Sequence, residues 1–153
     1  MIEPAVWVFF YGSYMNFAVL REVDLVPERW EVASLAGFDI RIQPRANLVR
    51  SDRDCVYGIV ATATHRQLGR LYAHAKDVLG EVYLPEAVLV QTLDGKTRPA
   101  LCYIAPDMRA APAAADYVAR IVGPARDFRF PDWYVQRLQA FAPGPSAPGA
   151  PTA

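Results

Sequence analysis

An uninterrupted apolar segment near the start of the chain, Ala5-Val-Trp-Val-Phe-Phe10, constrains the fold more than any other feature of the sequence. It holds β-branched and aromatic residues without polar alternation, which is typical of a strand buried on both faces. Tyr11-Gly12-Ser13 follows directly, and glycine permits backbone angles that other residues resist. The sequence therefore predicts a buried strand over residues 5–10 that ends in a sharp turn.

Strands dominate the first two thirds of the chain. Asp94-Gly95 is a strong hairpin signal and predicts that the strands on either side of it pair. Residues 43–54 are polar and rich in arginine, and we expect them to form a loop. The expected strands, besides the first, are residues 30–34, 37–42, 55–63, 84–93 and 98–105.

Helices are expected singly among these strands or at the end. Thr64 is a good N-cap for a helix that runs to about Lys76, and Pro131 suits the first position of the last helix. The other expected helices are residues 16–23 and 113–122. Since strands and helices do not alternate regularly, the sequence predicts an α+β fold, a small mixed, mostly antiparallel β-barrel with flanking helices.

The chain has 153 residues, of which 53 % are hydrophobic, and this length fits one domain with its own core. Residues 142–153 contain only Ala, Pro, Gly, Ser and Thr. Such a segment cannot bury apolar surface, so we expect a disordered tail. The predicted folded domain therefore covers residues 1–141.

Charge and composition exclude several classes of protein. Sixteen basic and sixteen acidic residues cancel, whereas nucleic-acid binders usually show a basic excess. The apolar runs are too short to span a bilayer, and the first residues do not form a signal peptide. Two cysteines cannot build a disulfide framework. We therefore expect a soluble cytoplasmic protein, monomeric or homodimeric, with no nucleic-acid or membrane partner.

Motifs for metal, nucleophilic or phosphate chemistry are not found in the sequence. His65 and His74 are nine residues apart, which is not a metal-ligand spacing, so no metal is expected. Ser13 is not part of a Gly-x-Ser-x-Gly motif. Cys55 and Cys102 lie within apolar strands and are interpreted as buried hydrophobic residues.

Three other features could form a site. The turn after the first strand exposes successive backbone amides, which suits a carboxylate or an oxyanion, although Gly12 could simply turn the chain. A carboxylate held in an apolar cleft could act as a general base, and Asp77 and Glu81 lie between an expected helix and strand. The arginines 41, 45, 50 and 53 are most simply a solvated run, or at most one wall of a pocket for an anionic ligand.

The order of these features resembles the γ-glutamylcyclotransferase superfamily over nearly the whole folded chain. Val-Phe-Phe-Tyr-Gly-Ser at residues 8–13 looks like its opening Tyr-Gly-Ser-Asn motif, and Cys55-Val-Tyr-Gly-Ile-Val60 looks like its Val-x-Gly-hydrophobic strand. The hairpin at Asp94-Gly95 fits its later strands. The match near the end of the chain consists of Tyr117, Pro124-Ala125 and Pro131-Asp-Trp-Tyr134.

The resemblance implies a small mixed β-barrel with flanking helices and an enzyme that releases 5-oxoproline from a small γ-glutamyl amine or peptide. The substrate's own α-amine attacks its γ-carbonyl, a step that is favoured because it is intramolecular, and a glutamate serves as general base. No cofactor is implied. The residues implied in substrate binding are Tyr11, Gly12, Ser13, Tyr14, Met15 and Tyr117.

Two departures from the family pattern matter. The Asn of the opening motif is replaced by Tyr14. The family's Leu-Asp-x-x-Glu-Gly places its base on Ala75 when aligned forward from Leu71, and on Asp77 when aligned backward from Tyr83. Glu81 is a third possibility if the loop folds inward. The candidate catalytic residues are therefore Asp77 and Glu81, of which the sequence favours Asp77.

Two alternatives to this enzyme stay open. Ala75 at the forward-aligned position favours a non-catalytic protein that keeps the pocket for an amino-acid-like ligand. Tyr14 leaves room for a different acyl or amine transfer in the same cleft.

Overall fold

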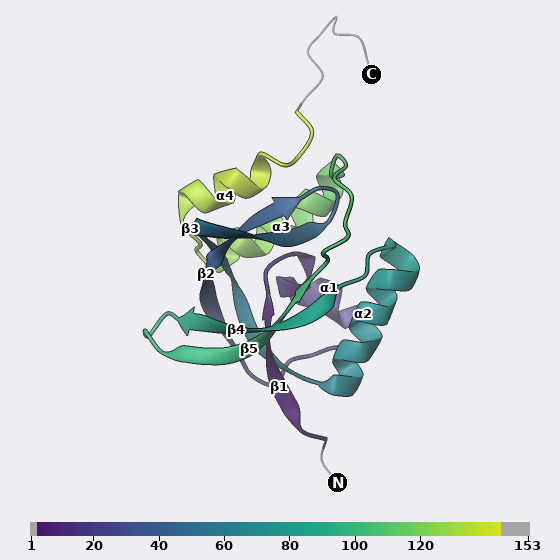
Figure 1. Cartoon of the computed structure of the whole chain (residues 1–153), viewed down its shortest axis with the longest axis vertical. Helices are drawn as coiled ribbons and strands as arrows, with labels where there is room; N and C mark the ends of the chain where they lie inside the picture. Colours follow the sequence, from purple (N-terminus) through teal and green to yellow (C-terminus); the bar gives the residue numbers. More distant parts are fainter. Residues whose placement is uncertain (1–2, 145–153) are drawn as a thin grey trace, which may run out of the picture.

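Five strands form a closed barrel in the order β1-β3-β2-β4-β5, shown in Figure 1. In this computed structural model, which describes residues 3–144, β1 pairs with β5 in parallel and the other four pairings are antiparallel. The predicted fold class is therefore confirmed. The strands are β1 (Ala5–Phe10), β2 (Trp30–Ile42), β3 (Ala46–Thr64), β4 (Leu84–Thr92) and β5 (Thr97–Ile104).

The apolar character of β1 follows from its place between β3 and β5. Val8, Phe9 and Phe10 are all buried, although successive side chains of a strand point to opposite faces. One face lies inside the barrel. The helix α2 (His65–Leu79) lies along the outside (Figure 1), where Tyr72 stacks on Tyr103 of β5.

The second and third strands form one long hairpin, and the expected loop over residues 43–54 is wrong. Only residues 43–45 of this range lie outside the strands. Residues 46–54 belong to β3, and residues 46–50 pair with β2, with Leu48 opposite Ile40 and Arg50 opposite Phe38, whereas residues 51–54 fall at the register shift and have no partner on β2. The prediction failed because polar residues alternate with buried ones such as Ala46 and Leu48, which point inward. Residues 30–34 and 37–42 likewise form a single strand, whose register shifts at Gly37, the residue with a φ of 89°.

The helices occur where they were expected, with different ends. Thr64 is the N-cap of α2, as predicted. It forms a capping box with Gln67, and Gly80 ends the helix in the left-handed conformation. The third helix continues through Pro124 and is longer than expected, whereas Pro131 is the N-cap of the fourth helix rather than its first residue. The remaining elements are the 3-10 helix η1 (Ser13–Met15), α1 (Phe17–Arg21), α3 (Ala115–Asp127) and α4 (Asp132–Gln139).

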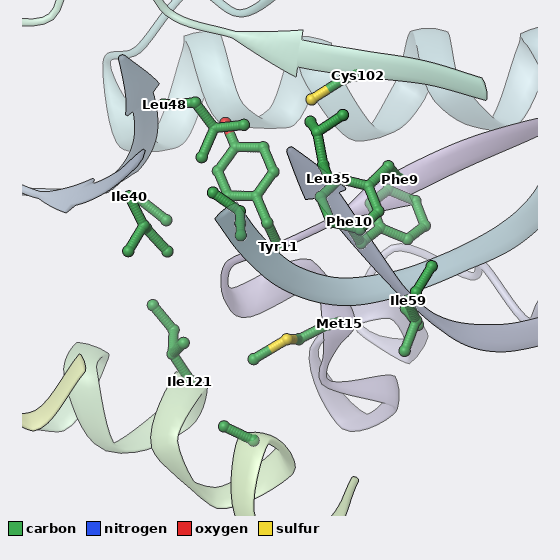
Figure 2. Packing of buried hydrophobic residues seen from close by; sticks show 14 of the residues in the cluster. Phe9, Phe10, Tyr11, Met15, Leu35, Ile40, Leu48, Ile59, Cys102 and Ile121 are labelled. Carbon is green, nitrogen blue, oxygen red and sulfur yellow. The ribbon is translucent and has the colours of Figure 1, made fainter. Parts of the chain in front are cut away.

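The core fills the barrel and extends to α3. Figure 2 shows Phe10, Leu35 and Cys102 gathered in the barrel, and Met15 facing Ile121 of α3. Cys102 is buried, as predicted, whereas Cys55 is only half-buried. No helix in residues 3–144 is long and apolar enough to cross a membrane. The predicted tail, residues 142–153, lies mostly outside the described residues and stays a prediction.

Candidate functional site

A cavity of about 30 Å³ lies where β1 ends, large enough for about two water molecules. Its wall includes the turn residues 11–14, the aromatic residues Phe9 and Phe10, and three residues of other segments, Arg45, Ala46 and Leu79. Six of the eight tyrosines of the chain also line it. They are Tyr11, Tyr14, Tyr72, Tyr83, Tyr103 and Tyr117.

The turn after β1 lies very close to the start of β3. A Cβ atom at Gly12 would stand 2.4 Å from the Cβ of Ala46, so only glycine fits without a shift of the backbone. The turn then enters η1, where the amides of Met15 and Asn16 donate back to the carbonyls of Gly12 and Ser13. Within the described chain, the amides of Gly12, Ser13 and Tyr14 donate to no backbone carbonyl. The turn therefore presents free donors.

A second glycine makes room for the end of β1. A Cβ at Gly58 of β3 would meet the carbonyl oxygen of Phe10 at 2.2 Å and the ring of Phe9 at 3.0 Å. Gly58, the glycine of the segment Cys55–Val60, is therefore needed because it lets β1 and β3 approach closely just before the turn.

Ala46 joins three segments of the site. Its amide donates to the hydroxyl oxygen of Tyr117 at 2.8 Å, and the hydroxyl of Tyr83 donates to its carbonyl at 2.7 Å. The side-chain amide of the next residue, Asn47, exchanges two hydrogen bonds with the backbone of Ala105. These contacts fix the start of β3 against α3, against the segment that leads to β4, and against the end of β5.

The tyrosines pack against one another. The rings of Tyr72 and Tyr103 stack with centroids 3.8 Å apart, and the ring of Tyr14 meets that of Tyr72 edge-on at 5.7 Å. The hydroxyl of Tyr11 donates to the carbonyl of Tyr103 at 2.6 Å. The hydroxyl of Tyr14 is buried and has no hydrogen-bond partner within residues 3–144, so the cavity offers an unused polar group.

Burial keeps these hydroxyls neutral. It raises the pKa of Tyr14 to about 12 and the pKa values of Tyr11 and Tyr72 well above 10. Burial also raises the pKa values of Tyr83 and Tyr117. A neutral phenol donates a hydrogen bond and does not take up a proton at neutral pH, so these tyrosines can orient a ligand but do not serve as general bases.

Arg45 brings positive charge to the cavity. Its guanidinium lies 4.8 Å from the ring centroid of Tyr117. The other arginines of the same run are engaged or exposed, since Arg41 pairs with Asp39, Arg50 pairs with Glu86 and Arg53 is exposed. Of these four arginines, Arg45 is the one that lines the cavity. A positive charge in the wall suits an anionic ligand.

The structure places the two candidate catalytic carboxylates differently. Asp77 is exposed on α2 and does not line the cavity. Glu81 is half-buried just after α2, and its amide donates to the carbonyl of Ala75 at 3.1 Å. Its charge contributes to the raised pKa values of Tyr83 and Tyr117, after the larger effect of burial. Of the two carboxylates, Glu81 is therefore the one whose charge acts on the cavity.

The end of α2 provides a third alignment of the Glu-Gly pattern, besides those that start from Leu71 and Tyr83. If the glycine of the Glu-Gly step is Gly80, which caps the helix, the residue before it is Leu79, and Leu79 lines the cavity. Ala75, the forward-aligned position, is fully buried and does not line it. No carboxylate of residues 3–144 is among the lining residues.

The cavity brings together five of the six residues expected in binding, Tyr11, Gly12, Ser13, Tyr14 and Tyr117. Met15 is fully buried and faces Ile121 instead (Figure 2). Tyr72, Tyr83 and Tyr103 also line the cavity, although they were not among the predicted site residues. Their one signal was the large number of tyrosines in a short chain.

No model of a protein family matches this chain, and no curated protein matches it significantly. Solved structures do. A gamma-glutamyl cyclotransferase is 23 % identical, with a TM-score of 0.78 over 92 % of this chain and 90 % of that one. An uncharacterized human protein is 22 % identical, with a TM-score of 0.77 over 95 % and 92 % of the two chains. A glutathione-specific gamma-glutamyl cyclotransferase from yeast is 13 % identical, with a TM-score of 0.61 over 90 % and 95 %. The chain therefore has the gamma-glutamyl cyclotransferase fold.

Proposed function

We propose that this chain is a γ-glutamylcyclotransferase-like enzyme that releases 5-oxoproline from a γ-glutamyl amine or peptide, with Glu81 as its general base. The observation that carries the proposal is the donor-rich turn in the cavity wall, with the half-buried Glu81 two residues before the lining residue Tyr83. The turn has free amides at Gly12, Ser13 and Tyr14, and Glu81 acts electrostatically on two hydroxyls of the same cavity.

The proposed reaction needs only groups of the chain and the substrate. The α-amine forms a bond with the γ-carbonyl carbon, while Glu81 takes up the proton that the amine releases. The negative charge that develops on the carbonyl oxygen is stabilised by the free amides of the turn. The bond from the γ-carbon to the leaving nitrogen then breaks, and Glu81 returns the proton to that nitrogen. The products are 5-oxoproline and the free amine or peptide.

The dimensions of the cavity agree with this arrangement. The cavity has room for about two water molecules, which is enough for a carbonyl group. The γ-carbonyl would enter beside the turn, and the unpartnered hydroxyl of Tyr14 would gain an acceptor. The charged head of the ligand would remain near the half-exposed side chains of Arg45 and Glu81.

A non-catalytic binding protein is the second candidate, and one observation favours it. Leu79 stands in the cavity wall immediately before the capping glycine, where the Glu-Gly pattern of the resemblance would place the base. A protein with this wall would keep the free amides and the tyrosines and would bind the same amino-acid-like ligand without converting it.

The test is an assay of product by mass spectrometry. The purified protein is incubated with a panel of γ-glutamyl amines and dipeptides, and every product is identified, so that transfer of the acyl group to another amine is also seen. Glu81→Gln removes the proposed base without changing the size of the side chain. Asp77→Asn is the matched control, because it neutralises an exposed carboxylate of the adjacent helix.

We expect release of 5-oxoproline that Glu81→Gln lowers by at least about a hundredfold, the usual contribution of a general base, and that Asp77→Asn leaves unchanged. If the folded protein binds members of the panel but releases no 5-oxoproline, the enzyme is refuted and the binding protein is supported. Loss of activity in Asp77→Asn alone would assign the base to Asp77.

A further inference from the structure

We infer that Arg45, in the cavity wall, binds the α-carboxylate of the ligand, and that the site, with Glu81 nearby, selects zwitterionic α-amino-acid derivatives. The inference deepens the proposed function and rests on it for the γ-glutamyl identity of the ligand. It assigns a specificity-determining role to a residue outside the turn.

The position of Arg45 supports this role. It immediately precedes Ala46, whose backbone is held by the hydroxyl groups of Tyr117 and Tyr83. Its guanidinium rests over the face of the Tyr117 ring at 4.8 Å, a favourable arrangement for a cation. The side chain is therefore held at the cavity with its hydrogen-bond donors available.

Arg45 forms no salt bridge with any carboxylate in residues 3–144. The arginines on either side of it along the hairpin, Arg41 and Arg50, are both paired. An unpaired guanidinium in a cavity wall suits a carboxylate of the ligand, which it can bind through two parallel hydrogen bonds.

Glu81 supplies a charge of opposite sign near the cavity, although it is not one of the lining residues. It lies two residues before Tyr83, whose hydroxyl contacts Ala46 next to Arg45. The charges of Arg45 and Glu81 act with opposite sign on the hydroxyls of both Tyr83 and Tyr117, yet the two side chains are not within salt-bridge distance of each other. Separated charges of opposite sign match an α-carbon that bears both an ammonium and a carboxylate group.

A ligand carboxylate has two sources, the γ-glutamyl head and a leaving amino acid, and the experiment separates them. Four probes are titrated: γ-glutamyl methylamide, the same compound without its α-carboxylate, the same compound without its α-amine, and a γ-glutamyl dipeptide. The proteins are wild type, Arg45→Gln and Arg53→Gln, an exposed arginine of the same hairpin as control. Protein NMR spectra give the dissociation constants, and ligand signals in the same samples report 5-oxoproline.

We expect Arg45→Gln to weaken binding of γ-glutamyl methylamide about tenfold or more, as loss of a hydrogen bond to a charged group predicts. Binding of the probe without α-carboxylate should be equally weak in wild type and variant, and Arg53→Gln should behave as wild type. Equal weakening of all probes, or of none, would overturn the inference, as would an effect confined to the dipeptide, which would assign Arg45 to the leaving group. Binding that follows the expected pattern without 5-oxoproline would refute the enzyme and leave the role of Arg45 intact.

Discussion

Gly12→Ala tests the close contact on which the site is built. The new Cβ would stand 2.4 Å from the Cβ of Ala46, more than 1 Å inside ordinary van der Waals contact, and both atoms are fixed to backbone. The start of β3 must therefore move, although the hydroxyls of Tyr83 and Tyr117 hold it. Overpacking of this kind costs about 1–3 kcal/mol, and for a domain of this size we expect the melting temperature to fall by about 2–12 °C.

The assay is chemical and thermal unfolding of four proteins: wild type, Gly12→Ala, Ala46→Gly and the double variant. Ala46→Gly removes the methyl group that the new Cβ meets, at a cost of about 0.5–1 kcal/mol for glycine in a strand. We expect the double variant to be more stable than the sum of the single effects predicts, by about 1 kcal/mol or more. Gly69→Ala is the matched control, because nothing lies within 4 Å of that position in α2, and it should stabilise the helix. Additive effects, or a Gly12→Ala protein as stable as wild type, would refute the reasoning.

Two further predictions concern stability. Thr64→Ala removes the capping box of α2 and should lower the free energy of unfolding by about 1 kcal/mol, measured by urea denaturation. Burial raises the pKa of Tyr14 to about 12, above the value of about 10 in an unfolded chain. The stability linked to this shift is fully present below pH 10 and is lost as the pH rises toward 12. Urea midpoints should therefore fall over that range, and tyrosinate absorbance should appear with unfolding.

The sequence predicted the elements whose signals are local. The apolar run of β1, the N-cap at Thr64 and the hairpin at Asp94-Gly95 all have direct physical causes within a few residues, and the structure shows each of them. The first part of β3 was missed because its outward-facing residues, such as Arg50 and Asp52, are polar. Only the partner strand β2 reveals that Leu48 points inward.

The part of the site that a single segment forms could be predicted from the sequence. The part that several segments form together could not. The turn at Gly12 was found from its own residues. The roles of Tyr72, Tyr83 and Arg45 depend on α2, β3 and the segment before β4 meeting at one cavity, and no spacing along the chain encodes that meeting. The same reason explains why the register of the base stayed open, since the end of α2 at Gly80 is a property of the folded helix.

A substitution at Leu79, in the cavity wall, tests directly where the general base must lie. Leu79→Glu would place a carboxylate among the lining residues of the cavity that also holds the free amides of the turn and the positive charge of Arg45. Leu79→Gln has nearly the same size and shape without a base. A displacement of about 1 Å can cost a hundredfold in rate, so a carboxylate in the wall should serve better than Glu81 beside it. We expect Leu79→Glu to release 5-oxoproline at least about tenfold faster than Leu79→Gln, and to do so also when combined with Glu81→Gln. Thermal melts of both variants check that each is folded. Equal rates in two folded variants would show that this wall does not face the reacting amine, and the placement of the γ-glutamyl group in the cavity would then be wrong.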